Sequence, residues 1–234
     1  MRAILLSVLA SSVLAFTGCV PETTSNDDPD VQAPEFTADQ GQVTHTKAAY
    51  PEGPFGLEIG SIAENYKFIG YAKPHEDQEN YYEIQLSDFY NPTGDGVYEE
   101  GSVHGAGNPK PTVLLIAVSA VWCGPCQYEN AELLPVEYAE YAPQGAEFLL
   151  QLADGPTVGV PAKFSHLKSW TTKYDTKWPA VIDPSSKLSA LFEADAFPAN
   201  ILIDTTTMEI VDVIAGVPPA DGPFFDTLEA HLKN

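Results

Sequence analysis

Residues 112–126 read TVLLIAVSAVWCGPC, and this stretch decides how the rest of the chain is interpreted. Its first half, residues 112–118, is almost wholly apolar, rich in β-branched side chains and preceded by Pro111. So short and so apolar a run predicts a buried strand. The stretch ends in Trp122-Cys123-Gly124-Pro125-Cys126, so two cysteines follow directly after the predicted strand.

A helical pattern follows the second cysteine. One helix face is predicted for the residues that recur at three- and four-residue steps, which are Ala131, Leu134, Tyr138 and Tyr141. Cys123 then lies at the helix N-terminus, where unpaired backbone N–H groups and the helix dipole stabilise a thiolate and lower the pKa of the thiol. Cys126 lies one turn later, within reach of a disulfide, and Pro125 fits the first turn because its missing N–H would have no partner there.

The cysteine pair suits redox turnover better than it suits a structural link. A bridge across so short a loop constrains the unfolded chain little. The alternatives are an ordinary disulfide or half of a zinc site, but zinc would need further Cys or His ligands. Cys19 is the only other cysteine and the five histidines are scattered singly. We therefore predict a redox-active Cys123–Cys126 dithiol with no metal and no other cofactor.

Composition limits the partners of the chain. Its 234 residues are 44% hydrophobic, enough for one good core, and its 33 acidic against 11 basic residues give a net charge of −22. Such a surface repels nucleic acid phosphates and anionic lipid head groups, so neither is expected as a partner. The charge itself is interpreted as a solubility surface.

The N-terminus has the outline of a secretory signal peptide. Arg2 is followed by an apolar stretch, residues 3–16, which is too short to span a bilayer. The ending, Phe16-Thr17-Gly18-Cys19, resembles a bacterial lipoprotein signal, in which the cysteine becomes the lipidated first residue; Gly18 fits, but Phe16 stands where Leu is usual. We predict a signal peptide over residues 1–18 and lipid attachment at Cys19, with a plain secreted protein as the alternative. Export would place the dithiol where disulfides persist.

The remainder divides into a tether and one domain. Residues 19–56 are rich in Pro, Thr, Asp, Glu and Gln and predict a disordered acidic tether. In the predicted domain, residues 57–234, strands are expected over residues 81–86, 147–153, 200–203 and 210–215, and a short extended piece over 178–182. Helices are expected over residues 160–174 and 224–232, after Ser185 or Ser186, and as a turn at 86–89. This alternation predicts an α/β sandwich with a mixed sheet.

Three segments of the domain carry a family resemblance. They are residues 122–129 (WCGPCQYE), residues 178–184 (WPAVIDP), and residues 196–204 (AFPANILID) with the following strand, residues 210–216. Together they resemble the thioredoxin superfamily, and within it the TlpA/ResA-type thiol–disulfide oxidoreductases, from about Glu58 to the C-terminus. The resemblance implies a thioredoxin-like three-layer sandwich, in which helices flank a mixed central β-sheet, and an exported lipoprotein enzyme of the cell envelope.

The resemblance also implies roles for individual residues. Cys123 attacks a substrate disulfide and Cys126 resolves the mixed disulfide. Pro198 matches the cis-proline beside the sulfurs, which exposes the backbone of Phe197 to an extended substrate peptide; a trans proline that starts a strand is the alternative. The implied substrate-binding residues are Trp122, Gly124, Pro125, Phe197 and Pro198.

Glu129 matches the glutamate that ResA-type members use as a proton carrier near the dithiol. A carboxylate there could take the proton of Cys126 during resolution. An ordinary surface glutamate is the alternative, and both interpretations stay open. Thioredoxin itself carries a buried Asp six residues before the first cysteine, where this chain has Ala117. A general thioredoxin role is therefore less expected.

The implied partners are a disulfide-containing envelope protein and a membrane redox protein that recycles the dithiol. The lipid on Cys19 would hold the chain to a membrane, and Val20 is not the aspartate of inner-membrane retention, which favours the outer membrane. The Gly-Pro pair between the cysteines resembles that of reducing members, so we expect reduction of protein disulfides.

Two other function classes fit the sequence less well. A peroxiredoxin-like peroxidase would need Thr and Pro where this chain has Ala120 and Ile116. A non-enzymatic tethered adaptor or copper chaperone is the other class, and a copper carrier of this fold would have three residues between its cysteines, where this chain has two.

Overall fold

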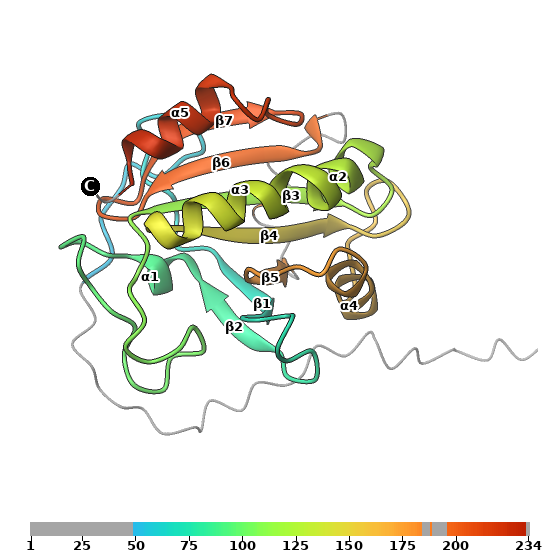
Figure 1. Ribbon diagram of the computed structural model, residues 1–234, viewed down its shortest axis with the longest axis horizontal. Coiled ribbons are helices and arrows are strands. Elements are labelled where there is room, and N and C mark those ends of the chain that lie inside the picture. Colours follow the sequence, from blue (N-terminus) through green and yellow to red (C-terminus); the bar gives the residue numbers. More distant parts are fainter. Residues whose placement is uncertain (1–48, 184–187, 189–195, 233–234) are drawn as a thin grey trace, which may run out of the picture.

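The computed structural model describes residues 49–183, Leu188 and residues 196–232 (Figure 1). The predicted signal peptide, Cys19, most of the predicted tether and most of the helix predicted after Ser185 or Ser186 lie outside the described residues. Within the described part, no helix is both long enough and apolar enough to cross a bilayer.

The described residues form one mixed sheet with the strand order β2-β1-β5-β4-β3-β6-β7. The strands are β1 (Lys67–Tyr71), β2 (Tyr82–Gln85), β3 (Val113–Ala120), β4 (Ala146–Asp154), β5 (Ala180–Ile182), β6 (Ala199–Asp204) and β7 (Glu209–Ala215). β3, β4 and β5 are parallel to one another, and the remaining neighbours pair antiparallel. β3 lies between β4 and β6 with all eight of its residues buried, as its apolar run predicts.

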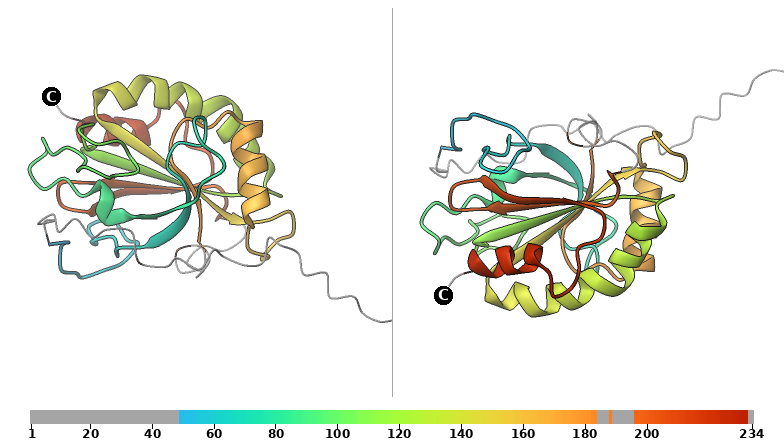
Figure 2. Two further views of the ribbon diagram at one scale, coloured as in Figure 1. Left: turned by 90° about the horizontal axis from the view of Figure 1, so that it is seen from below. Right: turned by 90° about the horizontal axis from the view of Figure 1, so that it is seen from above.

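Helices cover this sheet unequally. They are α1 (Leu86–Phe89), α2 (Gly124–Tyr128), α3 (Leu134–Tyr141), α4 (Phe164–Lys173) and α5 (Pro223–Ala230), with a π-helical turn η2 (Glu129–Leu133) and a 3-10 turn η3 (Ala142–Gln144). Side chains of α3, α4 and α5 join one apolar cluster with one face of the sheet, and Figure 2 shows α3 and α5 on the same side. Residues of α1 pack with the opposite face. The predicted α/β fold with a mixed sheet is confirmed.

β1 is a strand that the sequence pattern did not predict. Its residue Gly70 pairs with Val181 of β5, and a Cβ at this position would clash with the backbone carbonyl oxygen of Ala180. Glycine is therefore required by the close approach of two backbones. The same residue interrupts the apolar pattern that would have indicated the strand.

The helix after the cysteines departs from the predicted face. The backbone N–H of Leu134 bonds to the carbonyl oxygen of Glu129, five residues back, so the turn between α2 and α3 is wider than an α-helical turn. Pro135 follows directly, and in a regular helix its ring would clash with the carbonyl group four residues earlier. Because of the extra residue, Ala131 is exposed, whereas Glu129 and Asn130 are both fully buried. The predicted placement of Ala131 with Leu134 and Tyr138 is wrong.

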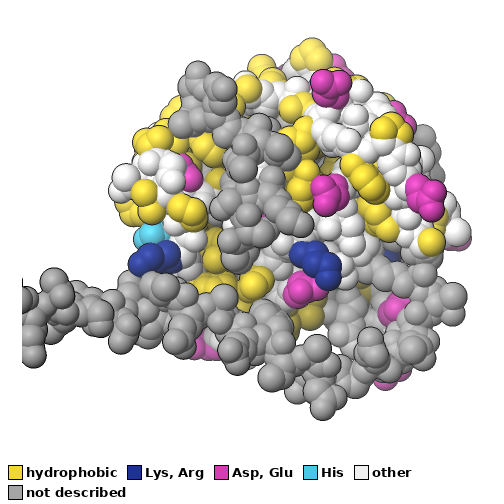
Figure 3. Space-filling model, turned by 180° about the vertical axis from the view of Figure 1, so that it is seen from behind, with side chains coloured by type: hydrophobic (Ala, Val, Ile, Leu, Met, Phe, Trp, Pro, Cys, Tyr) yellow, Lys and Arg dark blue, Asp and Glu magenta, His cyan; other side chains and the backbone are white. Residues whose placement is uncertain are grey.

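The acidic side chains do not gather into a single patch on the face drawn in Figure 3. Asp and Glu side chains lie apart from one another there, most of them among hydrophobic and neutral side chains and one beside a Lys or Arg side chain.

Candidate active site

The two cysteines lie where β3 ends and α2 begins. The register of β3 against β4 shifts between Ser119 and Ala120, and the backbone N–H of Cys123 bonds to the Ala120 carbonyl oxygen at 3.1 Å. Cys123 is the N-cap of α2: its backbone is extended, and its Sγ accepts a hydrogen bond from the backbone N–H of Cys126 at 3.1 Å. The predicted position of the first sulfur at a helix N-terminus is confirmed.

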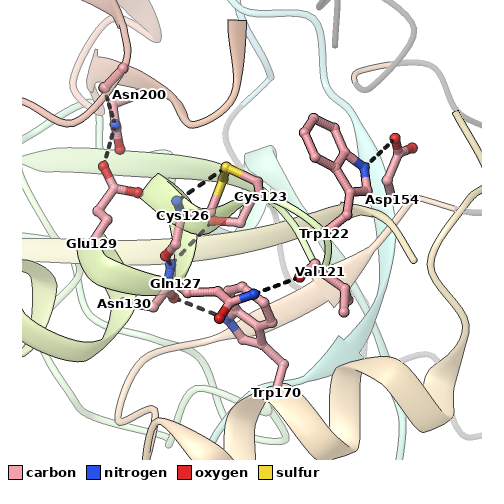
Figure 4. Close-up of a disulfide and its surroundings, with 12 residues drawn as sticks. Val121, Trp122, Cys123, Cys126, Gln127, Glu129, Asn130, Asp154, Trp170 and Asn200 are labelled. Carbon is pink, nitrogen blue, oxygen red and sulfur yellow. Dashed lines mark hydrogen bonds between the residues drawn. A yellow bond between two sulfur atoms is a disulfide. The ribbon is translucent and has the colours of Figure 1, made fainter. Parts of the chain in front are cut away.

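A disulfide joins Cys123 to Cys126, with their Cα atoms 5.2 Å apart (Figure 4). Cys123 keeps 2% exposure and Cys126 has none. Both residues are buried, and Cys123 is the one that keeps some contact with the surface. Gly124 and Pro125 are exposed beside it, so these two predicted contact residues lie on the surface.

Two aromatic side chains from distant parts of the sequence meet near the disulfide. The rings of Trp122 and Phe197 lie edge to face with centroids 5.8 Å apart. The Phe197–Pro198 peptide bond is cis, as the family resemblance implied. The carbonyl oxygen of Pro198 accepts a hydrogen bond from the N–H of Gly216 at 2.7 Å, which ties this turn to the end of β7. The structure thus brings Trp122, Phe197 and the cysteine pair to one end of the sheet.

Asp154 fixes Trp122 in this position. Its Oδ2 accepts hydrogen bonds from the indole N–H of Trp122 at 3.1 Å and from the backbone N–H of Gly159 at 2.7 Å. The loop over residues 155–162 carries no charged side chain, and its Val158 and Val160 are about half exposed. Asp154 therefore joins the tryptophan to a neutral, apolar loop.

Glu129 lies in the protein interior, with no exposed area. The side-chain N–H of Asn200, on β6, donates a hydrogen bond of 2.7 Å to Glu129 Oε1 (Figure 4). Burial raises the pKa of Glu129 from 4.5 to about 8, and the Asn200 hydrogen bond opposes this rise. Glu129 is therefore a neutral acid over most of the pH range below 8, and not the surface side chain of the alternative interpretation.

Asn130 connects the start of the dithiol helix to β3 and α4 through hydrogen bonds. Its Nδ2 donates to the carbonyl oxygen of Cys126 at 3.0 Å and to Ser119 Oγ at 3.2 Å, and its Oδ1 accepts from the indole N–H of Trp170 at 3.2 Å. The residue is fully buried. It links β3, the dithiol helix and α4 through a satisfied polar network.

Three of these residues were not predicted as parts of the site. They are Asn130, Asp154 and Asn200. Asn200 carried the clearest signal, because it is a polar residue within the otherwise apolar strand ANILI, residues 199–203. Such a residue in a buried strand needs a partner, and the sequence does not name that partner.

The described residues contain no group of three or more His, Cys, Asp or Glu side chains arranged to hold a metal ion. Cys19, the predicted lipid attachment site, is outside the described part of the chain.

Comparison with known proteins confirms the predicted resemblance to TlpA/ResA-type members of the thioredoxin superfamily. The thiol-disulfide oxidoreductase ResA of Bacillus cereus is 28% identical over 95 residues, which are 41% of this chain and 50% of that relative. This chain therefore spans about half the length of the curated relative it matches. No family model matches the chain.

Two solved structures share the fold. One is assigned as a thiol:disulfide interchange protein DsbE from Chlorobium tepidum, with a TM-score of 0.53 and 19% identity over 75% of this chain and 99% of that chain. The other is assigned as a protein disulfide isomerase from Bacteroides thetaiotaomicron, with a TM-score of 0.53 and 15% identity over 76% of this chain and 92% of that chain. The thioredoxin-like fold is confirmed by these similarities.

Proposed function

We propose that this chain is a thiol–disulfide oxidoreductase of the bacterial cell envelope that reduces protein disulfides through Cys123 and Cys126. One observation carries the proposal: Cys123 Sγ accepts a hydrogen bond from the backbone N–H of Cys126, in the first turn of a helix, and is joined to the sulfur of that same residue. That geometry stabilises a thiolate and allows a reversible bridge. The similarity to ResA and the thioredoxin-like fold support it.

The reaction starts from the dithiol form. The Cys123 thiolate attacks one sulfur of the substrate disulfide, and the other substrate sulfur leaves with the electron pair and takes up a proton. The Cys126 thiolate then attacks Cys123 Sγ, the bond from Cys123 to the substrate breaks, and the second substrate thiol leaves. Two electrons and two protons pass to the substrate, and the protein is left with the disulfide that the structure shows.

Glu129 would carry the proton of Cys126 in this cycle. It lies three residues after Cys126 on the same helical segment, and it has no exposed area. Its raised pKa of about 8 lies near the range of a cysteine thiol, so a proton can pass between carboxyl and sulfur in either direction at little cost.

A substrate peptide would reach Cys123 across the surface formed by Trp122, Gly124, Pro125, Phe197 and Pro198. The two aromatic rings would supply apolar contact area, and the exposed helix start would leave room for an extended chain. We assign the same surface to a membrane-bound redox partner that returns electrons to the disulfide, because both reactions need access to Cys123.

The location of the protein is also a proposal. The signal-like residues 1–18 and Cys19 support export and lipid anchoring, and Val20 favours the outer membrane over the inner. A protein held in this way would face an oxidising compartment, where its disulfide substrates persist.

Reduction of insulin disulfides, followed as turbidity with dithiothreitol as the electron donor, tests the activity. The wild-type chain should accelerate precipitation of the insulin B chain, and Cys123→Ala should abolish this. Full activity in that variant would refute the assignment. Cys126→Ala should instead accumulate a mixed disulfide through Cys123, and mass spectrometry of that adduct from envelope extracts would identify the substrate.

A further inference from the structure

Asn200 interrupts a strand that is otherwise apolar where it passes the dithiol helix. It is fully buried, and its neighbours Ala199 and Ile201 are buried apolar residues. Its side chain points toward Glu129 from β6, across the gap between the sheet and the helix (Figure 4). A leucine at this position would avoid the cost of burying an amide, so the amide is not explained by packing.

The hydrogen bonds of Asn200 define which way its amide faces. Nδ2 lies 2.7 Å from Glu129 Oε1 and 3.4 Å from the carbonyl oxygen of Gly216. A carbonyl oxygen only accepts, so the NH₂ end of the amide faces both of these atoms. Asn200 Oδ1 and Glu129 Oε2 are buried and have no hydrogen-bond partner among the described residues.

We propose that Asn200 is a positioning residue that holds Glu129 so that Oε2 carries the proton exchanged with Cys126. This inference rests on the proposed function, because it concerns the proton step of the same dithiol. It assigns to Asn200 no contact with substrate or with sulfur.

The chemistry of a neutral carboxyl group gives the reason. One oxygen of the group carries the proton and the other is a carbonyl oxygen, and an N–H donor pairs with the carbonyl oxygen. With Oε1 bound by Asn200, the proton is placed on Oε2. In Figure 4, Oε1 points to Asn200 and the second oxygen points to the side on which the disulfide lies.

The electrostatic surroundings keep this carboxyl protonated in the oxidised protein. Burial raises the pKa of Glu129 to about 8, Asn200 lowers it, and no charged group among the described residues contributes. Asn200 faces it from β6 and does not titrate, and the same amide is bonded to the backbone carbonyl oxygen of Gly216 at the end of β7. Three titratable residues precede it on its own helical segment. Cys123 and Cys126 are tied in the disulfide, and the side chain of Tyr128 is exposed at the surface.

Reduction of the protein by a dithiol then proceeds in balanced steps. One thiolate of the dithiol attacks Cys123 Sγ, the S–S bond breaks, and its electron pair goes to Cys126 Sγ. The Oε2 proton moves to Cys126, and the carboxylate left on Glu129 is stabilised by the Asn200 N–H. The second thiolate of the dithiol, its proton given up to solvent, attacks its partner's sulfur in the mixed disulfide. Cys123 leaves as a thiolate, and the dithiol is oxidised to a disulfide by two electrons.

Stopped-flow reduction of the oxidised protein by dithiothreitol between about pH 6 and 11 tests the proposal. The rate, corrected for the thiolate fraction of the reagent, should fall above the pKa of Glu129. Asn200→Leu removes the donor at similar volume, so the corrected rate should fall by about tenfold or more, and its midpoint should move up by about one to two pH units. If this variant does not fold, Asn200→Ala gives the same comparison without added bulk.

Glu129→Gln provides the matched background. In that background the substitution of Asn200 should change neither the rate nor its pH profile by more than about twofold, since the coupled group is gone. Equal effects with and without Glu129 would show a merely structural role and overturn the proposal, as would a wild-type profile in Asn200→Leu. Failure of the wild-type chain to reduce insulin would refute the proposed function but not this inference. The two outcomes can be told apart because dithiothreitol reduces the internal disulfide without any protein substrate.

Discussion

Substitution of Glu129 by Gln should remove a pH dependence from the stability of the oxidised protein. Burial raises the pKa of this carboxyl from 4.5 to about 8 in the folded state. Between these two values the folded state binds more protons than the unfolded state, so the free energy of unfolding falls as the pH rises through the window. The contribution is fully present below about pH 4.5 and is lost by about pH 8.

The size of the effect follows from the separation of the two pKa values. At about 1.36 kcal/mol per pH unit, this separation corresponds to a loss of about 3 to 4 kcal/mol between pH 5 and pH 8. Gln keeps an acceptor for the Asn200 N–H and cannot ionise, so the variant lacks this loss. Glu147, whose pKa burial raises to about 7, contributes equally to both proteins and cancels in the comparison.

Urea unfolding of the oxidised proteins at pH 5, 6, 7 and 8 measures the effect at constant ionic strength. The two proteins should have similar stability at pH 5, and Glu129→Gln should be the more stable by about 3 to 4 kcal/mol at pH 8. Glu132→Gln, at an exposed position of the same helical turn, is the control and should follow the wild type. Parallel curves for wild type and Glu129→Gln would refute the reasoning, because the carboxyl would then be ionised in the folded state.

Three further substitutions test the framework around the dithiol. Gly70→Ala places a methyl group against the Ala180 carbonyl oxygen, so thermal melts should show a loss of at least about 3 kcal/mol or an insoluble protein. Asn130→Ala leaves three buried hydrogen bonds unmade and should lower the free energy of unfolding in urea by about 2 to 4 kcal/mol. Asp154→Ala removes the acceptor of the Trp122 indole, which should cost about 1 kcal/mol and shift the tryptophan emission, whereas Asp154→Asn keeps an acceptor and should stay near wild type.

Local signals in the sequence account for the parts of the fold that could be predicted. β3 is apolar on both faces because it lies in the middle of the sheet, and the cysteine motif follows it within five residues. Both the strand and the helix N-terminus at Cys123 are properties of one short segment. They could therefore be inferred without knowing what packs against them.

Parts that depend on contacts between distant segments could not be predicted. Glu129 and Asn200 are 71 residues apart, and only the pairing of β3 with β6 brings them together. Asp154 and Trp122 are 32 residues apart and meet because β4 runs parallel to β3. In each case the sequence shows a polar residue that would need a hydrogen-bond partner if buried, and only the sheet topology identifies that partner.

The wrong placement of Ala131 has a different origin. A periodicity of 3.6 residues assumes a regular helix, and the widened turn ahead of Pro135 breaks that assumption. The proline was the available signal, since it cannot continue the hydrogen-bond pattern of a helix interior.

The widened turn also lets the dithiol segment and the segment that packs on the sheet take orientations that one regular helix could not give them. One additional residue corresponds to about 100° of rotation about the axis. The π-helical turn therefore rotates α3, which packs on the sheet, about the helix axis relative to α2, which bears the sulfurs. Deletion of the exposed Ala131 would restore a regular helical turn and rotate the carboxyl group of Glu129 away from Asn200 on β6. Every residue of the cysteine motif would remain in the chain.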